Sequence, residues 1–270
     1  MDILIAFLVV AGIALILGVL LALISHFFSV PENPVQQQVR ACLPGVNCGA
    51  CGYTGCDDYA AALAEGGVAP NLCIPGAQAV ADEIGASLGV EAGAPVNEMV
   101  AFVACNGNCE ATGKKAVYDG VATCTAASML FGGDGSCVYG CLGFGDCTRV
   151  CKFDAIHIVD GIAKVDEEKC VGCMSCSAVC PRSLIIPVEP ARNVVIACAS
   201  MARSSATIRG CTVGCLGCGK CEEVCPKGAI KVEKNLAVID YTKCDSCGKC
   251  AEICPNKLIK DSNVEHMQQV

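Results

Sequence analysis

Three stretches of the chain repeat one cysteine spacing, Cys-x-x-Cys-x-x-Cys-x-x-x-Cys-Pro, and they begin at Cys170, Cys215 and Cys244. A fourth stretch begins at Cys141, has irregular spacing, and is followed by Lys152 where the others have proline. In the regular pattern three closely spaced thiolates hold one iron–sulfur cluster, and the fourth Cys ligates the other cluster of a pair. The repeated spacing therefore predicts 4Fe-4S clusters.

Disulfides and zinc are the two other common uses of so many cysteines. The chain has 26 Cys in 270 residues, but disulfide scaffolds are typical of short secreted domains. Structural zinc sites favour two spaced pairs and often include histidine. The chain has only three His, none of them within a Cys stretch, so iron–sulfur ligation is the preferred interpretation.

The cysteine stretches form two copies of one unit. Each matched cysteine of the second copy follows its counterpart in the first copy by the same number of residues, so the two copies align without a gap at a constant offset. Seven pairs of cysteines share this offset, from Cys141 with Cys215 to Cys180 with Cys254. The same offset relates Cys124 to Cys198 and Cys137 to Cys211. This pattern indicates a tandem duplication in which the two halves fold alike.

Crossed ligation within each unit predicts the ligand sets. In the second unit these are Cys215, Cys218 and Cys221 with Cys254, and Cys244, Cys247 and Cys250 with Cys225. In the first unit one set is Cys170, Cys173 and Cys176 with Cys151, and the other contains Cys141, Cys147 and Cys180.

The last of these sets lacks a fourth ligand, because Phe144 stands where the offset requires the counterpart of Cys218. We expect Cys137 to complete it, since Cys137 lies in the same loop. A three-iron cluster, or no cluster, is the alternative at this position.

A different motif lies nearer the N-terminus, and its four cysteines are Cys48, Cys51, Cys56 and Cys73. Glycines alternate with the first three, so the loop can fold closely around a cluster. Zinc is compatible with the same four thiolates. With this motif the expected total is five 4Fe-4S clusters.

Six cysteines remain outside these sets: Cys42, Cys105, Cys109, Cys124, Cys198 and Cys211. We expect them to be buried small side chains. Alternatively, Cys105, Cys109 and Cys124 could contribute to another centre.

Short alternating segments at 155–159 and 229–232 predict small strands, with turns at Asp160-Gly161 and Lys234-Asn235. The segments after the cluster motifs, and an Ala-rich stretch from Asp57 to Glu65, predict short helices. The expected fold class is α+β: a small four-Cys iron–sulfur domain followed by two tandem dicluster ferredoxin modules of the bacterial type.

An unbroken apolar stretch runs from Ile3 to Ile24, which is long enough to span a bilayer as a helix. A cleaved signal peptide is disfavoured because no Lys or Arg precedes the stretch and no A-x-A site ends it. We expect a single transmembrane helix with the cysteine domains in the cytoplasm, where thiols stay reduced. The predicted parts are an anchor at 1–28, a linker at 29–40, a four-Cys domain at 41–95, a connecting segment at 96–136, ferredoxin modules at 137–190 and 191–260, and a polar tail at 261–270.

The formal net charge is −8, which argues against nucleic acid as a partner. An N-terminal anchor, Cys-Gly-Ala-Cys-Gly-Tyr-Thr-Gly-Cys at 48–56, and tandem units containing Gly-Cys-Leu-Gly together resemble the B subunits of Rnf electron-transport complexes. The resemblance covers essentially the whole chain, with Phe144 and Lys152 as departures.

The resemblance implies a membrane complex that oxidises reduced ferredoxin, reduces NAD and moves Na⁺ or H⁺ across the cell membrane. Integral-membrane, flavin-bearing and NAD-reducing subunits would be the partners, with soluble ferredoxin as electron donor. This chain would relay electrons without an NAD site, and it has no G-x-G-x-x-G motif after a strand. The alternatives are an iron–sulfur subunit of a hydrogenase or of a complex I-like enzyme, or a redox sensor.

Overall fold

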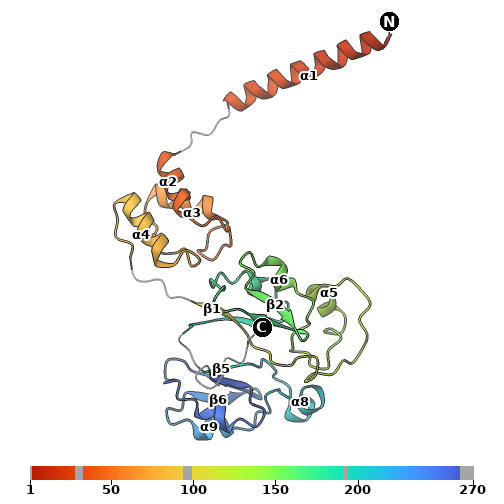
Figure 1. Cartoon of the computed structure of the whole chain (residues 1–270), viewed down its shortest axis with the longest axis vertical. Helices are drawn as coiled ribbons and strands as arrows, with labels where there is room; N and C mark the ends of the chain where they lie inside the picture. Colours follow the sequence, from red (N-terminus) through yellow and green to blue (C-terminus); the bar gives the residue numbers. More distant parts are fainter. Residues whose placement is uncertain (1, 28–32, 94–98, 191–193, 262–270) are drawn as a thin grey trace.

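The computed structural model describes residues 2–27, 33–93, 99–190 and 194–261. Its parts follow one another in chain order: an N-terminal helix, a three-helix domain, and two small α+β modules (Figure 1). This order agrees with the α+β expectation.

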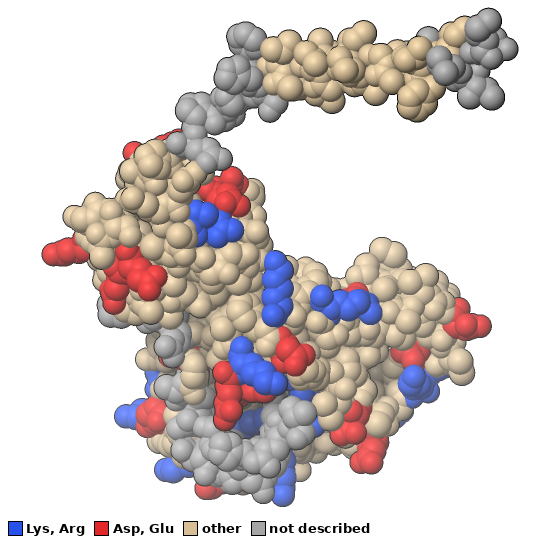
Figure 2. Space-filling model, turned by 45° about the horizontal axis from the view of Figure 1, so that its top comes forward, with Lys and Arg blue, Asp and Glu red and all other residues tan. Residues whose placement is uncertain are grey.

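Helix α1 (Asp2–Phe27) extends away from the other elements (Figure 1). Its described side chains are apolar and exposed, among them Phe7, Val10, Leu15 and Leu21. No charged side chain is visible along its described face (Figure 2). Judged on the described residues alone, no helix is both long and apolar enough to cross a membrane.

The three-helix domain contains α2 (Pro34–Cys42), α3 (Cys56–Glu65) and α4 (Ala77–Leu88). Helix α3 includes the stretch predicted to be helical. Tyr59 is buried at the centre of this domain, where its hydroxyl donates to Ala69 O at 2.8 Å and accepts from Leu72 N–H at 3.2 Å. These two bonds fix the loop between α3 and α4, which carries Cys73.

Each module contains two antiparallel strand pairs. The predicted hairpins are present as β2 (Ile156–Val159) with β3 (Ile162–Val165), and β6 (Ile230–Glu233) with β7 (Leu236–Ile239). Both central turn residues have positive φ in each hairpin, as the right-handed twist of a two-residue turn requires. The second pairs are β1 (Val100–Val103) with β4 (Ile185–Val188), and β5 (Val194–Ile196) with β8 (Ile259–Asp261).

Strand β1 lies within the predicted connecting segment, yet it pairs with β4 and belongs to the first module. All of its residues are buried. The part of this segment that forms β1 therefore contributes to that module's sheet and does not merely connect two domains.

Short helices join the strands, and five of the six contain one cysteine each. They are α5 (Cys124–Met129), α6 (Asp146–Val150), α7 (Ser175–Ala178), α8 (Ser204–Gly210), α9 (Lys220–Val224) and α10 (Lys249–Ile253). The aliphatic cores are small, and cysteines pack directly against them in both modules. Such modules depend on bound metal centres for much of their stability.

Candidate functional site

All 26 cysteines are free thiols, so no disulfide holds the modules together. Most of them lie in pockets, each lined by four cysteines. In the part of the chain that the structure describes, no three His, Cys, Asp or Glu side chains are grouped to hold a single metal ion.

The second module has two four-cysteine pockets. One pocket, of about 360 Å³, is lined by four cysteines that we name the second inner set: Cys215, Cys218, Cys221 and Cys254. The other pocket, of about 340 Å³, is lined by four cysteines that we name the second outer set: Cys225, Cys244, Cys247 and Cys250. The corresponding groups of the first module are named the first inner set and the first outer set. In each pocket the thiol from outside the Cys-x-x-Cys-x-x-Cys run comes from the other half of the module, which is the crossed arrangement.

The Gly-Cys-Leu-Gly motif holds the loop of each inner set against a hairpin. Gly217 has φ of +60°, and a Cβ there would lie 3.0 Å from the backbone of Asn235 in the β6–β7 turn. Its counterpart Gly143 has φ of +75°, and a Cβ would lie 2.5 Å from Gly161 O. Glycine is needed at both positions for the backbone conformation and for this close approach.

The first outer set is the group expected from the sequence, Cys151, Cys170, Cys173 and Cys176. After burial, which is the largest cause, the neighbouring thiols of Cys173 and Cys170 raise the pKa of Cys176. Cys151 and Cys170 both pack against the core of the first module that contains Cys176. Ala155 N–H donates to Cys151 Sγ at 3.4 Å, as Ala229 N–H donates to Cys225 Sγ at 3.3 Å in the second module. The two outer sets therefore follow the tandem repeat.

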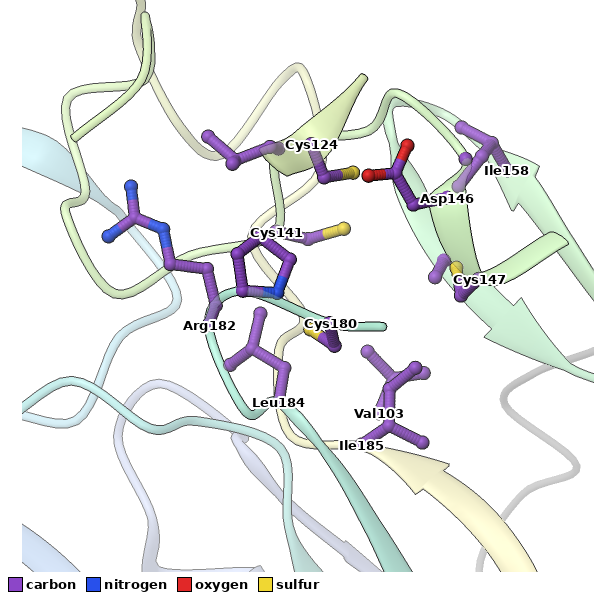
Figure 3. Close-up of a pocket in the computed structure, with 14 residues that line it drawn as sticks. Val103, Cys124, Cys141, Asp146, Cys147, Ile158, Cys180, Arg182, Leu184 and Ile185 are labelled. Atoms are coloured by element: carbon purple, nitrogen blue, oxygen red, sulfur yellow. The ribbon is translucent and has the colours of Figure 1, made fainter. Parts of the chain in front are cut away.

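The first inner set differs from the sequence-based expectation. Its pocket of about 400 Å³ is lined by Cys124, Cys141, Cys147 and Cys180. The four sulfur atoms surround one shared space (Figure 3). Cys137, the fourth member favoured by the sequence, lines a different pocket. The fourth thiol comes instead from the segment between β1 and the first cysteine motif.

A network of contacts places Cys124 over this pocket. Thr123 caps α5 by accepting from Ala126 N–H at 3.1 Å, and Asp146 at the start of α6 accepts from Thr125 N–H at 3.0 Å. Desolvation opposes ionisation of Asp146, but backbone hydrogen bonds from Thr125 and Cys124 outweigh it and lower the pKa. Helix α5 is thus attached to α6, which carries Cys147.

Phe144 occupies the position where the repeat has Cys218. Its ring packs edge-on against Tyr118, with ring centroids 5.3 Å apart. Tyr118 belongs to the same segment as Cys124. The segment between β1 and the first cysteine motif therefore supplies Cys124 as the fourth thiol of the pocket. It also supplies Tyr118, the aromatic partner of Phe144. The unmatched Phe144 beside an unassigned Cys124 is the signal that sequence reasoning could have used.

The N-terminal set lines a pocket of about 310 Å³ and consists of Cys48, Cys51, Cys56 and Cys73. Asn47 closes the loop, because its side-chain oxygen accepts from Cys56 N–H at 2.8 Å. This pocket adjoins the first module: Lys152 Nζ donates to Val46 O. Lys152, the departure from the proline that follows other motifs, thus joins the two domains.

A further pocket of about 350 Å³ lies between the two modules. We name its cysteines the bridging set: Cys105, Cys137, Cys198 and Cys211. The sequence favoured other roles for all four, Cys137 as a ligand of the first module and the others as buried side chains. Of the remaining cysteines, Cys42 hydrogen-bonds Gln38 O at 3.4 Å, and Cys109 is exposed.

Burial raises the pKa of many of these thiols. It raises the pKa of Cys105 and Cys147 to about 12, and the pKa values of Cys176, Cys221 and Cys250 to about 11. Neighbouring thiols raise them further, because several thiolates cannot share a dry pocket without compensation. Bound metal supplies that compensation and displaces the protons. The chemistry of the donor sets therefore fits a metal cluster.

Family models match three parts of the chain. A model for a putative Fe-S cluster matches residues 43–75, which contain the N-terminal set. Two models of 4Fe-4S dicluster domains match residues 169–230 and 214–258. The cofactors of the chain are therefore 4Fe-4S clusters.

Curated relatives match most of the chain. It is 45% identical over 231 residues to the B subunit of the Na(+)-translocating ferredoxin:NAD(+) oxidoreductase complex of Acetobacterium woodii, covering 85% of this chain and 69% of the relative. The B subunit of the proton-translocating ferredoxin:NAD(+) oxidoreductase complex of Clostridium ljungdahlii is 39% identical over 86% of this chain and 82% of its own length. The B subunit of the ion-translocating oxidoreductase complex of Methanosarcina acetivorans is 39% identical, over 87% and 89%.

Proposed function

This chain belongs to the family of B subunits of ion-translocating ferredoxin:NAD(+) oxidoreductase complexes, the Rnf complexes, and we propose that it accepts electrons from reduced ferredoxin and relays them toward NAD reduction. In the complex this reaction would be coupled to Na⁺ or H⁺ translocation. Bound 4Fe-4S clusters supply reversible one-electron transfer. The cysteines of this chain would hold those clusters, and backbone N–H groups donate hydrogen bonds to some of the cysteine sulfurs, as in Cys151 and Cys225.

The observation that carries this proposal is that neighbouring cysteine sets adjoin one another. Within the modules, α6 packs on α7 and α9 packs on α10. Beyond burial, which is the largest cause, Cys176 raises the pKa of Cys147, and Cys221 raises that of Cys250. A series of adjoining sets is suited to relaying electrons and is not required merely to stabilise a fold.

A similar contact links the N-terminal set to the first module. After burial, the thiol of Cys173 contributes to the raised pKa of Cys48. At the other end of the chain, Cys218 and Cys247 of the second module are exposed. We therefore place the ferredoxin docking site on the second module and the exit toward partner subunits at the N-terminal set.

Taken over the full sequence, the apolar stretch from Ile3 to Ile24 has the length of a bilayer span. We further propose that α1, which contains this stretch, is a single-pass membrane anchor, with the cysteine domains on the cytoplasmic side. Its exposed apolar side chains, without a neighbouring element to cover them in the described part of the chain, support this role. A reducing compartment is required to keep so many thiols free. Integral-membrane, flavin-bearing and NAD-reducing subunits would then be within reach of the N-terminal set.

The proposed ligand sets of five clusters are the N-terminal set and the inner and outer sets of both modules. Four of the five keep the residues expected from the sequence. In the first inner set we assign Cys124 in place of Cys137, because Cys124 lines the same pocket as Cys141, Cys147 and Cys180.

Crossed ligation gives a prediction for the second module. Cys225→Ser should damage the cluster of Cys244, Cys247 and Cys250, whereas Cys254→Ser should damage that of Cys215, Cys218 and Cys221. EPR spectra of the two reduced variants should therefore lose different signals. Identical spectra, or loss of the cluster adjacent in sequence, would show that the ligation is not crossed.

The proposed function is tested in membranes from cells that lack this chain. Ferredoxin-dependent NAD reduction should fall to background there and return when the chain is supplied. Oxidation of NADH by ferricyanide should persist, because the NAD site would lie on a partner subunit. Ferredoxin-dependent NAD reduction that continues without the chain would refute the proposal.

A further inference from the structure

We propose that the bridging pocket binds an additional 4Fe-4S cluster, held by two thiols from each module: Cys105, Cys137, Cys198 and Cys211. This inference goes beyond the five clusters of the proposed function and rests on it only in treating the other pockets as 4Fe-4S sites. No single stretch of sequence contains the four ligands. The site exists only where the two modules meet.

The two modules contribute equivalent thiols to this pocket. Cys105 directly follows Ala104, whose N–H donates to Leu184 O at 2.8 Å, and Cys198 directly follows Ala197, whose N–H donates to Leu258 O at 2.9 Å. Cys105 and Cys198 therefore follow equivalent strands, β1 and β5. Cys137 and Cys211 each lie shortly before the first cysteine of an inner set, at the same spacing. Matched pairs from duplicated modules indicate a built four-ligand site and not a chance grouping.

The sulfur atoms of this pocket accept hydrogen bonds, as metal-bound thiolates do. Ser200 N–H donates to Cys198 Sγ at 3.4 Å, and Thr112 Oγ1 donates to Cys211 Sγ at 3.5 Å. The pocket is also closed by backbone pairing between the modules, because Thr212 N–H donates to Ala111 O at 2.9 Å. Its volume of about 350 Å³ lies within the range of about 310 to 400 Å³ found for the other four-cysteine pockets.

The position of this pocket gives it a role in the relay. Cys141 of the first inner set donates its backbone N–H to Cys105 Sγ at 3.4 Å. Cys215 of the second inner set donates its backbone N–H to Cys198 Sγ at 3.3 Å. The first hydrogen bond therefore links the bridging set to the first inner set, and the second links it to the second inner set. A cluster here would join the two modules into one continuous path.

Metal analysis of the full-length chain, purified anaerobically and reconstituted with iron and sulfide, tests the inference. Six sets of four thiolates should hold about 24 iron atoms per chain. The double variant C105S/C198S should hold about 20, with the EPR signals of the other clusters retained. The matched control C42S/C109S removes two cysteines outside every set, and it should keep the full iron content.

Native mass spectrometry of the unmodified chain provides a reading that does not depend on how the variant folds. A mass corresponding to six 4Fe-4S clusters supports the inference, and a mass corresponding to five overturns it. Zinc bound at one atom per chain and lost in C105S/C198S would also overturn it. A chain with little iron in every variant would instead refute the proposed function.

Discussion

Replacing Cys51 by Ser should reduce ferredoxin-dependent NAD reduction by the assembled complex to background. Cys51 lines the N-terminal pocket with three other thiols, and this pocket adjoins the first module through Lys152 and Val46. If electrons leave the chain at this set, its loss stops the reaction while the sets in the modules stay intact. The measurement is NAD reduction in membranes that contain the variant in amounts matched to the unmodified chain.

Cys42→Ser is the matched control, because Cys42 lies in the same three-helix domain but lines none of the four-cysteine pockets described above. It should leave the rate unchanged. Reduced ferredoxin should still bleach the visible absorbance of the Cys51→Ser chain, which shows that the modules remain accessible. Normal turnover with the N-terminal cluster demonstrably missing would mean that this cluster only stabilises its domain.

Replacing Cys124 by Ser should remove the cluster of the first inner set, or convert it to a three-iron form. Three thiols would remain in the pocket, on Cys141, Cys147 and Cys180. Adding Phe144→Cys should restore the four-iron cluster, because it recreates the spacing that the second module uses with Cys218. Mössbauer and EPR spectra distinguish the two cluster types.

Cys109→Ser serves as the control for this pair of variants, since Cys109 is exposed and lies in the same segment between β1 and the first motif. Its spectra should match those of the unmodified chain. The contrary result is that Cys124→Ser keeps all its four-iron clusters while Cys137→Ser loses one from the first module. In that case Cys137, as the sequence indicated, is the fourth ligand of the first inner set.

Local spacing predicted most of what is local in this molecule. The hairpins and the short helices depend on residues that lie close together in the sequence. The crossed grouping in the second module joins two cysteine motifs, and the spacing within each motif indicates which thiol belongs to the other cluster. In these segments the turn residues and cysteine spacing leave few alternatives. For this reason the structure places them as the sequence indicated.

Upstream of Cys137 the constant offset does not identify which residues of the two modules are structurally equivalent. Cys124 and Cys198 share the constant offset of the repeat, yet in the structure Cys198 corresponds to Cys105, which follows the equivalent strand. The segment from Cys105 to Cys137 in the first module is much longer than that from Cys198 to Cys211 in the second. The constant offset takes no account of the longer segment in the first module. It therefore pairs Cys124, which lines the pocket of the first inner set, with Cys198, which lines the bridging pocket.

Contacts between distant segments were the other missing element. Strand β1 pairs with β4 from the far end of the first module, with Val103 opposite Ile185, and Thr212 of the second module bonds to Ala111 of the first. No turn or motif in the sequence specifies such pairs, since they depend on how whole modules pack. The bridging pocket results from these contacts, so four cysteines without a shared motif gave no sign of it.

Electron uptake by the isolated chain is the decisive measurement for its role as the acceptor of electrons from ferredoxin. The full-length chain, purified anaerobically with its iron complete, is mixed with reduced ferredoxin while its visible absorbance is recorded. We expect bleaching of the chain's iron–sulfur absorbance and a matching amount of oxidised ferredoxin, with no reduction of NAD by this chain alone. A chain that dithionite reduces fully but that stays oxidised in the presence of reduced ferredoxin would contradict this role.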